Sequence, residues 1–226
     1  MSGFRPAADA TAGPSPPPLR ADPRPADAYA SQYCEENAYL LAMAHTEATS
    51  AAGPAVGIFI SNPRREVYVW AQRAAPPTEP VVWDYHVVFA RQEGGRWLVY
   101  DPDTRLQPWP CPLDRYIEEA FHSRPADASF EVRFRVVSAA AFVVGFASDR
   151  SHMLDAGGAY MAPVPPWPPV GSGEHNLDEW LDVGAETPNE EGLGGARGVV
   201  AVGPQALWRA VQRHRIGTVV VRRLVS

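Results

Sequence analysis

The sequence predicts an α+β protein in which an antiparallel β-sheet packs against helices. Short runs rich in Val, Ile, Tyr, Phe and Trp recur between turns that contain Gly or Pro, which is typical of strands. Two of these runs, residues 81–90 and 97–101, flank the turn signal Glu93-Gly94-Gly95 and predict a hairpin. Helical patterns occur before and after this hairpin.

Composition predicts one domain and excludes several classes of protein. The chain has 226 residues, of which 46% are hydrophobic, and a net charge of −6, which argues against a nucleic-acid or anionic-membrane surface. Residues 1–27 contain almost no large apolar side chains, so we expect a disordered Pro/Ala-rich tail before a single domain over residues 28–226. No apolar run approaches the ~18 residues that span a bilayer, and the N-terminus does not resemble a secretory signal. We therefore expect a cytoplasmic protein, with the nucleus as a further location.

The first predicted helix covers residues 34–45. Acidic residues in its first turn suit the helix dipole, and Ser31 is a plausible N-cap. Cys34, Ala38 and Leu41 share one face, which we expect to point inward. Cys34 then lies where free backbone N–H groups and the dipole stabilise a thiolate. We predict that both cysteines are reduced, and a disulfide between Cys34 and Cys111 is the alternative.

The remaining elements follow in chain order. Because both faces of the central hairpin are apolar, we expect its sheet to be covered on both sides. Alternation of apolar and charged residues predicts a half-exposed strand over residues 130–137. The other predicted elements are strands at 56–60 and 66–70, an extended stretch at 107–112, helices at 113–122 and 203–214, a polar loop within 142–153, and long loops over 155–198 with one helical turn at 176–181.

The hairpin brings two chemically important residues together. If its turn centres on Glu93-Gly94, residue 86 pairs with residue 101, and the Cβ atoms of His86 and Asp101 lie roughly 5 Å apart. A histidine held by an aspartate is two-thirds of a nucleophilic triad, and Cys34 is the candidate nucleophile. The order Cys, His, Asp along the chain is that of papain-like and transglutaminase-like cysteine hydrolases.

Each of these residues also has a purely structural interpretation. Cys34 fits a buried inert thiol, His86 a hydrogen-bonded core histidine, and Asp101, which precedes Pro102, a turn residue. The residues alone leave both interpretations open.

Six motifs in order between residues 29 and 153 resemble those of the protein N-terminal glutamine amidohydrolase family. They are Tyr33-Cys34-Glu35-Glu36-Asn37, Phe59-Ile60-Ser61-Asn62, Val82-Trp83-Asp84-Tyr85-His86-Val87-Val88, Tyr100-Asp101-Pro102-Asp103-Thr104, Phe134-Arg135-Val136 and Phe146-Ala147-Ser148-Asp149-Arg150-Ser151-His152-Met153. A weaker match continues from residue 176 to the last helix. The sequence departs from the family's pattern in its longer Pro-rich tail, in Pro102 and in a Gly/Glu-rich insertion near residues 183–197.

The resemblance implies a monomeric enzyme with a transglutaminase-like core and the catalytic residues Cys34, His86 and Asp101. It implies hydrolysis of the side-chain amide of an N-terminal Gln, in a protein or peptide, to Glu and ammonia through a thioester, without a metal or organic cofactor. The family feeds the N-degron pathway, in which the new N-terminal Glu can be arginylated.

Recognition of a free N-terminus requires a group that pairs with the α-ammonium. Asp84 is the first candidate, because it lies two residues before His86 and so on the same strand face. Glu35 is the second and Asp149 the third, and Tyr33 is expected to form a wall of the pocket. A structural hydrogen bond or cap is the alternative role of each acidic residue.

The neighbours of these residues are assigned to packing. The alternation predicts that Trp83 and Tyr85 point to the opposite sheet face, into the core. Ser148, Arg150 and His152 are expected to brace the site.

Two other functions are compatible with the sequence. One is a cysteine peptidase or acyltransferase of the same architecture. The other is a module that binds N-terminal residues without turnover.

Overall fold

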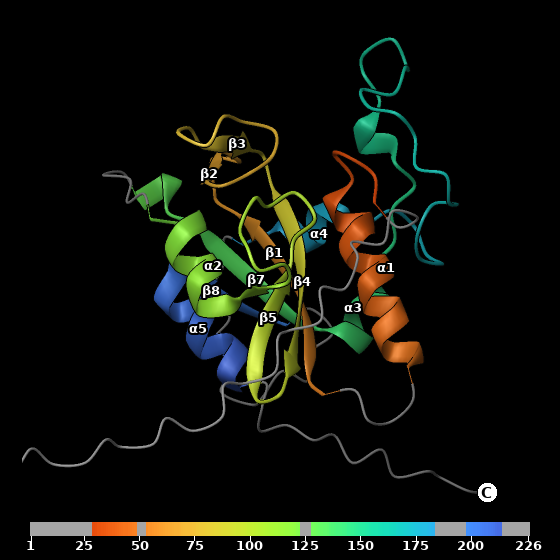
Figure 1. Ribbon diagram of the computed structural model, residues 1–226. Coiled ribbons are helices and arrows are strands. Elements are labelled where there is room, and N and C mark those ends of the chain that lie inside the picture. The colour runs from red at the N-terminus through yellow and green to blue at the C-terminus, as the bar shows by residue number, and fades with distance from the viewer. Residues whose placement is uncertain (1–28, 49–52, 123–127, 184–197, 214–226) are drawn as a thin grey trace, which may run out of the picture.

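The computed structural model describes residues 29–48, 53–122, 128–183 and 198–213 (Figure 1). The predicted disordered tail, residues 1–27, and most of the insertion near residues 183–197 lie outside the described residues. The extent of the single domain, 28–226, therefore stays a prediction. No helix within the described ranges is long and apolar enough to span a membrane.

Helices and strands alternate irregularly along the chain. The helices are α1 (Cys34–Glu47), α2 (Leu113–Ala120), α3 (Ala139–Gly145), α4 (Leu177–Leu181) and α5 (Pro204–Arg213), with 3-10 turns at Ala128–Phe130 and Ser151–Met153. The strands are β1 (Ala55–Ser61), β2 (Val67–Val69), β3 (Val81–Trp83), β4 (His86–Glu93), β5 (Arg96–Tyr100), β6 (Cys111–Pro112), β7 (Arg133–Ser138) and β8 (Val199–Val202).

Six strands form one sheet in the order β6-β5-β4-β1-β7-β8, and every neighbouring pair is antiparallel. Strands β2 and β3 form a separate two-stranded sheet. Figure 1 shows α1 and α3 on one side of the large sheet and α2 and α5 on the other. These findings confirm the predicted α+β class; a transglutaminase- or papain-like core stays a prediction.

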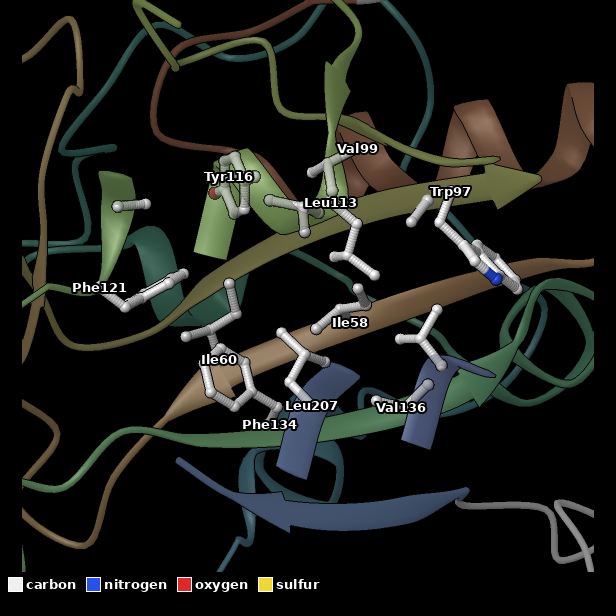
Figure 2. Packing of buried hydrophobic residues seen from close by; sticks show 14 of the residues in the cluster. Ile58, Ile60, Trp97, Val99, Leu113, Tyr116, Phe121, Phe134, Val136 and Leu207 are labelled. Carbon is white, nitrogen blue, oxygen red and sulfur yellow. The ribbon is translucent and has the colours of Figure 1, made fainter. Parts of the chain in front are cut away.

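Alternation along β1 divides the core into two apolar clusters. Ile58 and Ile60 point toward α2 and α5, where they pack with Leu113, Tyr116 and Leu207 (Figure 2). Phe59 points the other way and meets Phe142 of α3 edge-on, with ring centroids 5.0 Å apart. The sheet is thus covered on both faces, as its apolar hairpin predicted.

The strand predicted over residues 81–90 is interrupted, which corrects the sequence analysis. It breaks at Asp84 and Tyr85, so that β3 pairs with β2 while β4 begins at His86 in the large sheet. The hydroxyl of Ser61 donates a hydrogen bond of 3.1 Å to the carbonyl of Asp84 at this break. Alternation counted across the break therefore assigns Trp83 to the wrong face, whereas Tyr85 lies with Val87 and Phe89 as predicted.

The hairpin register also differs from the prediction by two residues. Phe89 pairs with Tyr100 and Glu93 with Arg96, so the turn centres on Gly94-Gly95 rather than on Glu93-Gly94. Both glycines have positive φ, 53° and 82°, which the favoured two-residue hairpin turn requires at both central positions. Because a shift of two residues preserves the sheet face, His86 and Asp101 still share one side.

Three further predictions about elements are wrong. Ser31 does not cap α1: the N-cap is Tyr33, which makes no side-chain capping bond. Helix α3, capped by a hydrogen bond of 3.1 Å from the Ala141 N–H to the Ser138 hydroxyl, extends into the segment predicted as a loop. Strand β7 is not half-exposed, because Arg135 is buried and donates a hydrogen bond of 2.9 Å to the carbonyl of Trp180 in α4. Strand β8, which borders β7, was missed.

Candidate active site

Cys34 is the first residue of α1 and is partly exposed. Its thiol lies 3.7 Å from Oε2 of Glu35 and donates a long hydrogen bond to it. The backbone N–H of Val87 in β4 also reaches the sulfur and favours its ionised form. The sulfur therefore lies against β4, beside the residue that follows His86. Cys111 is likewise a free thiol, buried in β6.

His86 begins β4 and is almost completely buried. Its Nε2 atom lies 3.2 Å from Oδ1 of Asp101, within ion-pair distance although not aligned as a full hydrogen bond. The indole of Trp83 stacks on the imidazole, with ring centroids 5.8 Å apart and planes inclined by 10°. The other imidazole nitrogen of His86, Nδ1, has no hydrogen-bond partner among the described residues and is free for a proton from a nucleophile or substrate.

Asp101 follows the end of β5 and is fully buried in a set of donors. Its Oδ2 accepts hydrogen bonds of 2.9 Å from Gln72 Nε2 and 2.8 Å from the Tyr116 hydroxyl. Its Oδ1 accepts one of 2.9 Å from the backbone N–H of Asp103. Burial raises the pKa of Asp101, but His86 and these side-chain donors outweigh burial and leave the pKa below its usual value. The carboxylate is therefore ionised and aimed at His86.

The electrostatics of the other two residues follow from burial and from neighbouring carboxylates. Burial lowers the pKa of His86, but the charge and hydrogen bond of Asp101, together with the charges of Asp103 and Glu35, outweigh burial and leave the pKa raised. Burial and then the charge of Glu35 raise the pKa of Cys34 well above that of a free thiol. This overturns the expectation that the helix start alone stabilises a thiolate: the same first turn also brings a carboxylate to the sulfur.

Asp103 adds a second carboxylate to the site. One donor atom each of His86, Asp101 and Asp103 lie within 4.8 Å of one another, close enough to hold a metal ion. The carboxylates are, however, already hydrogen-bonded by protein donors: Asp101 by Gln72 and Tyr116, and Asp103 by the Tyr29 hydroxyl at 2.6 Å. These bonds favour an acid–base group over a metal site.

Two of the predicted substrate-binding residues are fully buried. Glu35 accepts a hydrogen bond of 3.2 Å from the Tyr85 hydroxyl, and its Oε1 lies 3.3 Å from Nε2 of His152. Tyr33 is also fully buried, packs with Met153 and Ala162, and donates a hydrogen bond of 3.5 Å to the carbonyl of Ala162. Tyr33 therefore offers no surface to a ligand here.

The other two candidates are exposed. Asp84 lies in the break between β3 and β4, and its Oδ1 accepts the backbone N–H of Tyr85 at 3.0 Å. Its charge contributes to the raised pKa of Cys34, after burial and the charges of Glu35 and Asp103. Asp149 accepts the N–H of Ser151 at 2.8 Å and lies 3.1 Å from Nδ1 of His175. The carboxylate of Asp149 is thus engaged by its own loop and by His175.

Several residues of the site escaped the sequence analysis. Tyr85 is buried in the core with Val87 and Phe89, as predicted, but its hydroxyl also donates a hydrogen bond to Glu35. Trp83 was assigned to the same face, but it packs against the other cluster and stacks on His86 because the strand breaks after it. The partners of the two aspartates, Tyr29, Gln72 and Tyr116, were not considered. Only Asp103 had a signal, since it stands in the same motif as Asp101.

A buried ion pair braces the site, as expected for Arg150. Its guanidinium donates hydrogen bonds of 2.7 and 2.8 Å to the two carboxylate oxygens of Glu36. Both side chains are buried, and Trp167 donates a further bond of 2.6 Å to Glu36 from its indole. The pair fixes the first turn of α1, and with it Cys34, against the segment that follows α3.

Comparison with known proteins decides the family. A family model described as N-terminal glutamine amidase matches residues 29–202. The chain belongs to the N-terminal glutamine amidase family. The family match covers every candidate residue of the site and confirms the resemblance inferred from the six motifs.

Individual amidase relatives agree with the family match. The protein N-terminal glutamine amidohydrolases of Bos taurus and Homo sapiens are each 40% identical to this chain, over 169 and 166 residues. These alignments cover 73% and 71% of this chain, and 81% and 80% of the relatives. The Arabidopsis thaliana protein of the same name is 37% identical over 167 residues, which are 69% of this chain and 75% of the relative.

Proposed function

We propose that this protein hydrolyses the side-chain amide of an N-terminal glutamine, in a protein or peptide, to N-terminal glutamate and ammonia. The observation that supports this most directly is the His86–Asp101 pair, 3.2 Å apart, beside the strand residue that Cys34 contacts. A cysteine, a base and a group that orients the base are what acyl transfer by a thiolate needs. Family membership supplies the substrate class.

The first half of the reaction forms a thioester. Because the pKa of Cys34 is raised, its proton moves to His86 as the sulfur attacks the amide carbon of Gln. The raised pKa of His86 favours its holding this proton, and ionised Asp101 stabilises the imidazolium. The backbone N–H of Cys34 donates to the oxyanion, and one such donor typically lowers the barrier by about 3 kcal/mol. The carbon–nitrogen bond then breaks, and the nitrogen leaves as ammonia with the proton from His86.

The second half returns the enzyme to its starting state. Neutral His86 takes a proton from a water molecule, whose oxygen attacks the thioester carbon. The carbon–sulfur bond breaks, the Cys34 sulfur regains the proton from His86, and Glu is released. The sequence of steps consumes one water and produces one ammonia, and it uses only groups of this chain.

Asp84 is our candidate for the group that binds the α-ammonium. Its carboxylate is exposed and its charge acts on Cys34. The carboxylate of Glu35 is instead buried and accepts a hydrogen bond from Tyr85, and that of Asp149 accepts one from Ser151. In extended Gln the α-nitrogen is four bonds, or about 5 Å, from the carbon that is attacked. We expect Asp84→Asn to raise KM for a Gln peptide much more than it lowers kcat.

The wider setting follows from the family resemblance. We propose that the protein is a cytoplasmic monomer whose substrates are proteins and peptides with N-terminal Gln. Its product, N-terminal Glu, would then be a substrate for arginylation in the N-degron pathway.

Mass spectrometry of short peptides tests the proposal. We expect the small mass gain of amide-to-acid exchange, with ammonia release, for a peptide that begins with Gln, and none for its N-acetylated form or one that begins with Asn. Cys34→Ala and His86→Ala should each abolish it. Cleavage of the backbone would indicate a peptidase, and incorporation of an added amine an acyltransferase. Binding without turnover, unchanged in Cys34→Ala, would indicate a binding module.

A further inference from the structure

We propose that Asp103 is a positioning residue for this reaction: its carboxylate acts on His86 and Cys34 through its charge, and Tyr29 keeps it in place. The inference rests on the proposed function. The usual triad needs only one carboxylate beside its histidine, and here two, those of Asp101 and Asp103, lie in the group within 4.8 Å that includes His86.

The geometry holds Asp103 against the imidazole. Its side chain is buried, and its carboxylate belongs to the group within 4.8 Å that includes His86 and Asp101. Its backbone is fixed by two hydrogen bonds. The N–H donates one of 2.9 Å to Asp101 Oδ1, and the carbonyl accepts one of 2.8 Å from the N–H of Arg73. These bonds fix the backbone of Asp103, and its carboxylate cannot turn away from His86 without breaking the bond from Tyr29.

Tyr29 connects this carboxylate to the segment that leads into α1. Its hydroxyl donates a hydrogen bond of 2.6 Å to Oδ1 of Asp103, which lies 74 residues further along the chain. Burial and then the bond to Asp103 raise the pKa of Tyr29 to about 12, so it remains a donor throughout the neutral range. The same contact helps to fix the chain just before the nucleophile.

The two carboxylates differ in their donors. Asp101 accepts hydrogen bonds from Gln72 and Tyr116 and is ionised. The pKa of Asp103 is instead raised, first by burial and then by the charge of Asp101. The charges of His86 and Arg73 and the bond from Tyr29 lower this pKa but do not outweigh those two effects. A negative charge on one of two neighbouring carboxylates disfavours ionisation of the other, so the titrations of Asp101 and Asp103 are coupled. Proton transfer from Cys34 to His86 places a positive charge between two carboxylates and favours the ionised form of Asp103.

The charge of Asp103 in turn raises the pKa of two reacting groups. It raises that of His86, together with Asp101 and Glu35. It also raises that of Cys34, together with Glu35 and Asp84. Removing one negative charge must therefore lower both pKa values, and both limbs of the pH profile of kcat/KM must move to lower pH. A residue with only a structural role would lower the rate without moving either limb.

The test is the pH profile of kcat/KM on a Gln-initiated peptide for the full-length protein and three variants. We expect Asp103→Asn to move both limbs down by roughly 1 pH unit. Tyr29→Phe should move both limbs in the same direction by a smaller amount. Loss of the Tyr29 hydrogen bond raises the pKa of Asp103, so that its carboxylate is charged in a smaller fraction of molecules. Glu118→Gln, which removes the same charge from an exposed position on α2, should move neither limb.

A second measurement does not depend on turnover. The pH dependence of alkylation of Cys34 by iodoacetamide, located by mass spectrometry, reports the ionisation of the thiol. Its midpoint should fall in Asp103→Asn relative to the wild type and to Glu118→Gln. Unmoved limbs and an unmoved midpoint in Asp103→Asn would overturn the inference, whether or not the rate falls. If Asp103→Asn does not fold, an unmoved profile in Tyr29→Phe overturns it. A wild type that releases no ammonia refutes the proposed function, and the alkylation curves still decide the role of Asp103.

Discussion

Glu35 is the neighbour that most strongly opposes ionisation of Cys34, apart from burial itself. The carboxylate lies 3.7 Å from the sulfur and is held there by Tyr85 and His152. In the mechanism that we propose, this carboxylate keeps the Cys34 thiol protonated until His86 takes the proton.

Glu35→Gln tests that arrangement. Loss of the charge should lower the pKa of Cys34 and move its alkylation curve to lower pH by roughly 1 unit. The comparison is Glu36→Gln, in which the neighbouring carboxylate, paired with Arg150, is removed instead. An equal shift in both variants would show that proximity to the sulfur does not decide the effect.

Asp101 depends on the donors that surround it, and Tyr116→Phe removes one of them. A buried hydrogen bond to a charged group contributes about 1.5–3 kcal/mol, so we expect a loss of stability in that range, measured by urea denaturation. The pKa of Asp101 should also rise, which weakens its hold on the imidazolium and lowers kcat. Tyr39→Phe is the control, because the Tyr39 hydroxyl donates a hydrogen bond of 3.1 Å to the neutral carbonyl of Val143. A fall in kcat of the same size in that control would contradict the assignment.

At the scale of elements, β1 and α3 approach so closely that residue 57 has no room for a side chain. A Cβ at Gly57 would lie 2.7 Å from Cδ1 of Phe142. We expect Gly57→Ala to destabilise the protein by about 1–3 kcal/mol through overpacking, measured by thermal or urea unfolding. In a Phe142→Leu background the same substitution should destabilise less, because the clash is with that ring. Equal losses in both backgrounds would point to the backbone rather than to packing.

Helix α1 is fixed to the segment after α3 by the buried pair of Glu36 and Arg150. Arg150→Met leaves the carboxylate buried and without its charged partner, which typically costs about 3–5 kcal/mol. Arg115→Met is the matched control: it breaks the exposed ion pair with Glu119 in α2 and should cost about 0–1 kcal/mol. Comparable losses in the two variants, measured by urea denaturation, would show that burial does not strengthen the dependence on Arg150.

At the scale of the whole molecule, local patterns predicted the sheet and the site better than they predicted the joints between elements. Apolar alternation and a glycine turn were enough to bring His86 and Asp101 to one face, even with the register displaced by two residues. The break at Asp84 and Tyr85 was not visible, because each half of that segment has strand-like residues. The change of sheet there depends on contacts with β2 and Ser61.

Long-range polar partners could not be predicted at all. Gln72 meets Asp101 across 29 residues, Tyr29 meets Asp103 across 74, and Arg150 meets Glu36 across 114. A single polar residue in a sequence does not indicate which distant group it will satisfy. These partners nevertheless determine the charge states of the site, so the chemistry depends on contacts that only the folded molecule shows.

The same charge states connect the site to global stability. Asp101 raises the pKa of His86 above that of a free imidazole, about 6.5, so the protonated residue stabilises the fold. This contribution is fully present below the unfolded pKa and is lost as the pH rises through the folded one. The advantage of the wild type over His86→Gln in free energy of unfolding should therefore be full below about pH 6.5 and shrink as the pH rises through the raised pKa of His86. Urea denaturation followed by tryptophan fluorescence measures it at each pH.

Asp101→Asn is the control for this last prediction, because it leaves His86 without the carboxylate that raises its pKa. In the Asp101→Asn background, the difference made by His86→Gln should change less over the same range of pH. The depressed pKa of Asp101 has its effect at acidic pH. The stability that ionised Asp101 contributes is present above its unfolded pKa of about 3.9 and is lost as the pH falls through the folded value. The pair should therefore stabilise the fold most between these two limits. A wild-type advantage that stays constant or grows toward alkaline pH would show that His86 is neutral throughout, and that Asp101 orients the imidazole without holding its proton.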